Sequence, residues 1–426
     1  MDTPVKSKAG VLFPNYIKSK IRLSPQARLE EACGLALAIN LDVVYKEIIN
    51  IKDIKPSTFL GGGIITKLET IIAEQNLELL IIDNNLTPIQ QRNLEKKLKI
   101  KVIDRTALIL EIFGERANTR EGVLQVELAH LSYQRSRLVR SWTHLERQRG
   151  GAGFLGGPGE TQIELDRRII DDKIVKIKKE LEKVKKTRFI QRNSRKKIPY
   201  PVVAFVGYTN AGKSSMFNML TQANVFAKDL LFATLDPTMR KIKLPSGREV
   251  ILSDTVGFIS DLPHELIMAF RATLEEVLEA DIIVHVRDIA NTDTQEQKKD
   301  VLEVLENLGL KDIREKENYI ELLNKSDLLD EYSIQRIQNH LKHRDNKVLT
   351  SAITGEGKEL FLQMIDEKLS LGNLEKNITI SAAAGDILSW LYSNARIITQ
   401  IPMDDKIKIS MQISENKWKQ LENRLK

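Results

Sequence analysis

Apolar positions in the first third of the chain follow two alternating periods. Residues 24–40, 65–75 and 87–99 place apolar side chains at helical spacing. The runs 41–50, 77–83 and 100–104 between them are short and rich in Val, Ile and Leu, as buried strands are. This alternation predicts a small parallel α/β domain over residues 1–120.

Two long amphipathic segments follow, at residues 121–198. Apolar side chains repeat at spacings of three and four in both: Leu124, Leu128, Leu131, Leu138, Trp142 and Leu145 in the first, and Ile170, Ile174, Ile177, Leu181 and Val184 in the second. Such seams predict an antiparallel helical hairpin. Thr161 and Glu164 have the spacing of a capping box, so we expect the second helix to start at Thr161 and the connecting loop to span residues 150–160.

That loop contains Gly150, Gly151, Gly153, Gly156, Gly157, Pro158 and Gly159. Helix–helix connections need only about 2–8 residues, so eleven exceed what a turn requires. Glycine-rich backbone can approach phosphates and bases closely. The loop is therefore either a contact surface or an unusually long turn.

Composition describes a cytoplasmic protein with several domains. The 426 residues are 42% hydrophobic and 29% charged, without an apolar run long enough for a membrane helix and without a signal peptide. Cys33 is the single cysteine, which excludes an internal disulfide framework, and six scattered histidines leave no zinc-ligand spacing.

Positive charge is concentrated in one segment. The net charge of the chain is +7, whereas residues 166–197 alone hold 14 Lys/Arg against 5 Asp/Glu, a net charge of +9. The remainder is slightly acidic. A solvated helix face is one reading of this excess, but its continuation through residues 185–197 favours contact with a nucleic acid.

A phosphate-binding loop opens the third piece, residues 199–371. A buried strand at 202–206 leads into Gly207-x4-Gly212-Lys213-Ser214 and an amphipathic helix, which is the context that this motif requires. Backbone N–H groups of such a loop close around the β-phosphate, the lysine bridges the β- and γ-phosphates, and the Ser214 hydroxyl ligates Mg²⁺.

The nucleotide base is indicated by Asn324-Lys325-Ser326-Asp327 at the end of a strand. We expect Asp327 to accept hydrogen bonds from guanine N1 and N2 and the Asn324 amide to engage the base. Ser351 and Ala352 lie where a backbone N–H would reach guanine O6.

Two further segments complete the predicted site. A strand delivers Asp254 beside the Mg²⁺ shell, and the Gly257 N–H is placed for the γ-phosphate. Thr234 is expected to close over Mg²⁺, with Thr238 as the competing candidate, and a β-hairpin turning at Ser246-Gly247 should lie between these segments. The full predicted GTP-contacting set is Gly207, Tyr208, Thr209, Asn210, Ala211, Gly212, Lys213, Ser214, Ser215, Phe232, Ala233, Thr234, Leu235, Asp236, Asp254, Thr255, Val256, Gly257, Asn324, Lys325, Ser326, Asp327, Ser351, Ala352 and Ile353.

Phe258 stands directly after Gly257, where many GTPases carry the glutamine that orients the attacking water. We therefore expect slow intrinsic hydrolysis that depends on an external stimulus. Asn210 is either a ligand for a K⁺ ion that assists catalysis or a residue that tolerates a tight turn.

These motifs, in this order and together with the sequence GFLGGPGETQIELDRR at residues 153–168, resemble the HflX family, a branch of translation-factor-related P-loop GTPases near Obg. The resemblance implies GTP hydrolysis coupled to binding the 50S ribosomal subunit and splitting ribosomes, with the glycine loop directed at 23S rRNA and no role for DNA. Implied RNA-contacting residues are the loop residues given above with Arg167, Arg168, Lys173 and Lys176. A ribosome-assembly GTPase similar to Obg or Era, and a GTP-dependent adaptor of a membrane protease with peripheral membrane association, are the alternatives.

The resemblance has two departures. The segment FLGGGIITKL at residues 59–68 is looser than the family pattern, and Arg287 replaces an apolar residue at a buried strand end. Residues 372–426 mix short strands with a helix and predict a small α+β domain. Trp390 is expected in its core, and Trp418 is either a core residue or a residue that stacks on RNA. We expect a monomer.

Overall fold

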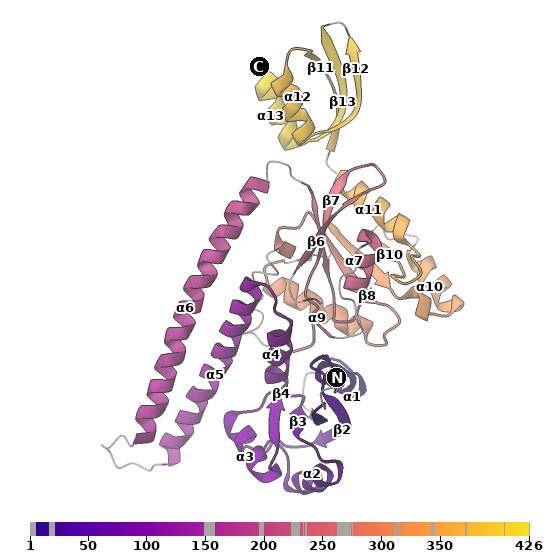
Figure 1. Cartoon of the computed structure of the whole chain (residues 1–426). Helices are drawn as coiled ribbons and strands as arrows, with labels where there is room; N and C mark the ends of the chain where they lie inside the picture. The colour runs from indigo at the N-terminus through magenta and orange to yellow at the C-terminus, as the bar shows by residue number, and fades with distance from the viewer. Residues whose placement is uncertain are drawn as a thin grey trace, which may run out of the picture.

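The computed structural model describes residues 6–16, 22–148, 158–195, 200–222, 231–232, 234, 237–261, 274, 276–310, 312–313, 316–341, 346–370, 373–403 and 405–425. These residues form an N-terminal α/β domain, a long helical arm, a central α/β domain and a small C-terminal α+β domain (Figure 1). The predicted fold class is confirmed. The C-terminal domain lies on the far side of the central domain from the N-terminal domain (Figure 1).

The N-terminal domain is a parallel four-stranded sheet of order β2-β1-β3-β4 with helices packed against it. Its elements are β1 (Lys8–Tyr16), α1 (Pro25–Ala38), β2 (Asp42–Ile51), α2 (Gly62–Gln75), β3 (Leu79–Ile82), α3 (Pro88–Leu98), β4 (Lys101–Asp104) and α4 (Arg105–Arg116). β1 was not predicted; it contains Pro14, and proline is rare within central strands. Nor was α4 predicted.

The arm consists of α5 (Arg120–Gln148) and α6 (Pro158–Arg195), which lie side by side (Figure 1). Their predicted apolar seams pack together through Leu124, Leu131, Ile174, Ile177 and Leu181. At 1.5 Å per residue, the 38 residues of α6 span about 57 Å. The predicted start at Thr161 is wrong: α6 begins at Pro158, since proline's fixed φ suits the first helical turn. Gly159 is therefore helical, and loop residues 150–157 fall outside the described part of the chain.

The central domain is a six-stranded sheet of order β10-β9-β8-β5-β7-β6, parallel except for β6. Its elements are β5 (Val202–Val206), α7 (Lys213–Thr221), β6 (Thr238–Lys243), β7 (Glu249–Asp254), β8 (Ile282–Asp288), α9 (Thr294–Asn307), β9 (Tyr319–Asn324), the 3₁₀ helix η2 (Ser326–Leu328), α10 (Glu331–Leu341), β10 (Lys347–Leu349) and α11 (Lys358–Ser370). β6 and β7 form the predicted hairpin, with Gly247 at φ 82° donating its N–H to Leu244 O over 2.8 Å.

The structure shows why a charged residue, Arg287, can occupy a buried strand end. Its guanidinium lies 2.9 Å from Glu321 on the adjacent strand β9, and Lys298 and Lys347 contact the same carboxylate. A buried cation can thus replace an apolar residue here, because the neighbouring strand supplies a buried anion.

The C-terminal domain packs α12 (Gly385–Asn394) and α13 (Glu415–Leu425) on an antiparallel sheet of β11 (Asn373–Ser381), β13 (Lys406–Ser414) and β12 (Arg396–Met403). Trp390 and Trp418 both pack against its apolar core. Within the described residues, none of the helices has the length and apolar character needed to span a membrane.

Candidate active site

The carboxyl ends of the parallel strands bring the predicted motifs to one edge of the central sheet. The phosphate-binding loop follows β5, Asp254 ends β7 and Asn324 ends β9. β7 and β8 both pair with β5, and β9 pairs with β8, so the three motifs lie within four consecutive strands of the sheet. Ligands of open α/β sheets bind at this edge.

Two glycines of the loop leave no room for a side chain. Gly207 has φ 155°, and a Cβ there would lie 2.2 Å from Val286 O. Gly212 has φ 92°, and its Cβ would lie 2.2 Å from Asn324 Nδ2. The loop geometry therefore depends on glycine at both positions.

Lys213 is buried at the start of α7, with its ammonium donating to Gly207 O at 3.1 Å and Tyr208 O at 2.9 Å. Burial lowers the pKa of Lys213 to about 8, although the charge of Asp254 acts in the opposite direction. A Cβ on Gly257 would lie 3.0 Å from the ammonium, so Gly257 faces it directly.

Three side chains form a compact oxygen cluster beside this lysine. Ser214 Oγ donates to Asp254 Oδ2 at 2.7 Å, Thr234 Oγ1 donates to the same oxygen at 2.9 Å, and the two hydroxyls are 2.9 Å apart. Asp254 Oδ1 is buried without a hydrogen-bond partner among the described residues, and burial raises the pKa of this carboxyl. Hydroxyl and carboxylate oxygens are the donors that Mg²⁺ prefers, so the residues fit that ion. Thr234, and not Thr238, lies in the cluster.

Asn324 joins two parts of the predicted site. Its amide is buried, donating to Ala211 O at 2.9 Å and accepting from Ala352 N at 3.0 Å. It thereby ties the phosphate-binding loop to the segment after β10.

The remaining base-recognition residues lie together. Asp327 is exposed and accepts a hydrogen bond from Ser351 Oγ at 2.5 Å. Lys325 pairs with Asp288 at 2.8 Å, and Ser326 is buried in the same turn. The Ser351 N–H donates to Glu356 O, whereas Ile353 is 81% exposed.

Phe258 is buried and its backbone is joined to the phosphate-binding loop. Thr209 N donates to Phe258 O at 2.7 Å, and Phe258 N donates to Gly207 O at 3.1 Å. Asn210 has φ 57°, a left-handed conformation that asparagine tolerates.

Two predicted GTP-contacting side chains face the N-terminal domain. Phe232 is buried, with its ring 4.7 Å from that of Phe113 in α4. The Tyr208 hydroxyl donates to Glu31 in α1 and lies 2.7 Å from Ser260 Oγ. Burial and the charge of Glu31 raise the pKa of Tyr208, which keeps the phenol protonated.

Most of the other predicted contacts surround the same loop. Thr209, Ala211, Thr255 and Val256 are buried and Ser215 is half-buried. Ala233, Leu235 and Asp236 fall outside the described residues. Sequence reasoning missed Glu31, because no local motif predicts its contact with Tyr208.

Family models match nearly the whole chain. They are described as GTP-binding GTPase N-terminal at residues 26–114, GTP-binding GTPase Middle Region at 116–195, 50S ribosome-binding GTPase at 202–325 and HflX C-terminal domain at 336–426. GTPase HflX of Magnetococcus marinus is 47% identical, covering 88% of this chain and 85% of the relative. The chain belongs to the HflX family of GTPases.

GTPase HflX of Escherichia coli is 43% identical, covering 84% of this chain and 82% of that protein. The crystal structure of a GTP-binding protein from Sulfolobus solfataricus in complex with GDP aligns at a TM-score of 0.45 and 24% identity, covering 85% of this chain and 98% of that one. As an HflX-family member, the chain is a GTP-hydrolysing P-loop enzyme.

Proposed function

We propose that the site binds GTP with Asp327 on guanine, Lys213 on the β- and γ-phosphates and the Gly257 N–H on the γ-phosphate. The observation that carries this assignment is the convergence of Lys213, Gly257 and the Ser214–Thr234–Asp254 cluster at the carboxyl edge of the sheet. Tyr208 and Phe232 are then support residues, since both side chains are directed at the N-terminal domain.

Ser214 and Thr234 would hold Mg²⁺, with Asp254 accepting hydrogen bonds from its shell. When bound, Mg²⁺ would neutralise charge on the transferred phosphoryl group. The unpartnered Asp254 Oδ1 supports this role, because a buried carboxylate oxygen without a donor is costly unless a ligand completes it.

The partner that we propose is the 50S subunit. The name of the family model matched at residues 202–325 includes 50S ribosome binding, and the exposed positive side chains Arg167, Arg168, Lys173 and Lys176 lie along α6. Such a helix would bind rRNA phosphates with strong salt dependence. The loop at residues 150–157, carried at the end of the arm, would enter the 23S rRNA.

The arm would split 70S ribosomes by competing for the ribosomal site that its loop enters. The test replaces residues 150–157 by a short flexible turn and measures 50S binding by sedimentation and 70S dissociation by light scattering. We expect binding to fall modestly and splitting to be lost. Splitting at the wild-type rate would show that the loop is only a turn.

The proposed activator is also the 50S subunit. Phe258 is buried and cannot orient water, so basal hydrolysis should be slow and rise at least about tenfold on 50S addition, a conservative bound because one missing catalytic contact typically costs about 10²–10³ in kcat. A fast basal rate, unchanged by 50S, would contradict this activation. Sedimentation with mature 70S particles and with precursors separates this function from ribosome assembly.

A further inference from the structure

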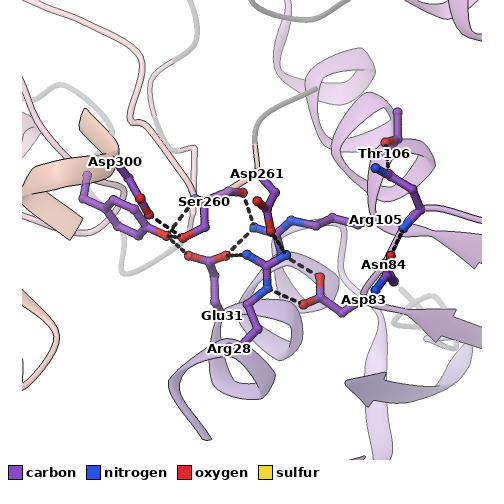
Figure 2. Close-up of polar contacts among 11 residues, drawn as sticks. Arg28, Glu31, Asp83, Asn84, Arg105, Thr106, Ser260, Asp261 and Asp300 are labelled. Atoms are coloured by element: carbon purple, nitrogen blue, oxygen red, sulfur yellow. Dashed lines mark hydrogen bonds and ion pairs between the residues drawn. The ribbon is translucent and has the colours of Figure 1, made fainter. Parts of the chain in front are cut away.

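Helix α4 contacts two segments of the candidate active site. At its first residue, Arg105 Nη2 donates to Ser260 O at 2.8 Å, two residues after Phe258 (Figure 2). Near its other end, Phe113 packs on Phe232, two residues before Thr234. One helix of the N-terminal domain thus borders both segments that would respond to the γ-phosphate.

A buried charge network holds this contact in place (Figure 2). Asp83 lies 2.7 Å from Arg28 and 2.6 Å from Arg105, while Glu31 contacts both Arg105 and Tyr208. Arg28 also pairs with Asp261 at 2.8 Å. Arg28, Asp83 and Arg105 are each at most 2% exposed. Buried charges with fixed partners leave little freedom for independent movement, because each broken pair leaves a charge unsolvated.

The arm is attached to the residue immediately before Arg105. Asp104 caps α4 by accepting from Ala107 N at 2.9 Å. From α5, Tyr133 donates to Asp104 Oδ1 at 2.9 Å and Arg137 Nη1 lies 3.3 Å from Asp104 Oδ2. Asp104 therefore contacts the arm, and the next residue, Arg105, contacts the candidate active site.

We propose that α4 couples the arm to GTP hydrolysis, with Asp104 and Arg105 as positioning residues that transmit the position of α5 to Ser260. This inference rests on the proposed function, in which the arm engages rRNA. Because Phe258 cannot orient the attacking water, the segment 257–260 must be positioned from outside, and Arg105 holds its last carbonyl. Because α4 borders both segments that would respond to the γ-phosphate and also contacts α5 through Asp104, GTP binding should in turn alter the attachment of α5.

The first test is Tyr133→Phe, which keeps the ring and removes the hydrogen bond to Asp104. Ser132→Ala is the matched control, since the Ser132 hydroxyl bonds to Leu128 O within α5. We expect 50S-stimulated kcat of Tyr133→Phe to fall about fivefold or more, the lower end of ordinary coupling strengths. Basal kcat, KM for GTP and 50S binding should match wild type at a temperature at which both proteins are folded, and Ser132→Ala should be stimulated normally. If Tyr133→Phe folds poorly, Arg137→Gln removes the other contact and carries the same expectation.

Equal stimulation of Tyr133→Phe and wild type would overturn the coupling. If 50S does not stimulate GTP hydrolysis by the wild-type protein at all, the proposed function fails. Amide hydrogen exchange then tests separately whether α4 couples the arm to the nucleotide site. A nonhydrolysable GTP analogue should then change amide exchange of residues 128–137 in wild type and less in Tyr133→Phe. An analogue that leaves this exchange unchanged in wild type would refute the link.

Discussion

Replacing Glu321 by glutamine should destabilise the central domain substantially. Its carboxylate oxygens lie 2.5 Å from Lys298 Nζ, 2.9 Å from Arg287 Nη1 and 3.2 Å from Lys347 Nζ. The Glu321 side chain is 3% exposed. Burial alone would raise the pKa of Glu321, but Lys298, Lys347 and Arg287 hold it at about 2. Glu321→Gln keeps the size of the side chain and leaves three cations without their anion.

The difference between a pKa of about 2 and the ordinary 4.5 corresponds to about 3 kcal/mol. Loss of one partner of a buried pair typically costs ~3–5 kcal/mol, which agrees. For a domain of this size the expected decrease in Tm is roughly 6–12 °C. A folded-state pKa below the unfolded value means that the stabilisation is present above pH 4.5 and is lost as pH falls towards 2. The difference in unfolding free energy between wild type and Glu321→Gln should therefore become smaller as the pH falls from 4.5 to 2.

Thermal unfolding of the full chain measures this effect, and the transition that shifts on adding GDP identifies the central domain. Glu317→Gln is the control, because that side chain is exposed. Replacing the pair together, as Arg287→Val with Glu321→Leu, should recover part of the stability, since the buried guanidinium is removed with its partner. Lys298 and Lys347 still lose their anion, but their side chains are 14% and 15% exposed and can reach water. A Tm decrease below about 2 °C for Glu321→Gln, less than ~1 kcal/mol for this size of domain, would refute the reasoning.

Three substitutions test the nucleotide assignments. Lys213→Ala should abolish GTP hydrolysis while Tm without nucleotide stays within a few degrees of wild type; retained turnover in a phosphate-release assay would place the activity elsewhere. Asp327→Asn should shift preference from GTP towards xanthosine triphosphate, and unchanged selectivity in a competition assay would remove Asp327 from the base site. Gly212→Ala should weaken GDP binding about tenfold or more by calorimetry, because its Cβ would displace the Asn324 amide and the left-handed backbone costs ~1–2 kcal/mol; near-wild-type affinity would contradict the tight packing of that loop.

Sequence alone determined the features that depend on local pattern. The strand–loop–helix context of Gly207–Ser214 and the seam of α5 and α6 follow from residues close together in the chain, and the fold class and family that they indicate are confirmed. Elements were missed where the local signal is weak or contrary. β1 contains a proline, the exposed strand β12 has little buried periodicity, and α6 starts before its apparent cap.

Only the tertiary structure decided which side chains meet across distant parts of the chain. Tyr208 was expected at the nucleotide but contacts Glu31, 177 residues earlier, and Arg287 lacked an explanation until Glu321 lay beside it. Neither pairing can be predicted from sequence periodicity. The partner of a buried charge or hydroxyl depends on how separate helices and strands pack against each other. Asp104 and Arg105 illustrate the same limit: their neighbours come from the arm and from the segment after β7. A buried polar group must find a partner in the folded state, but its own sequence neighbourhood does not say which one.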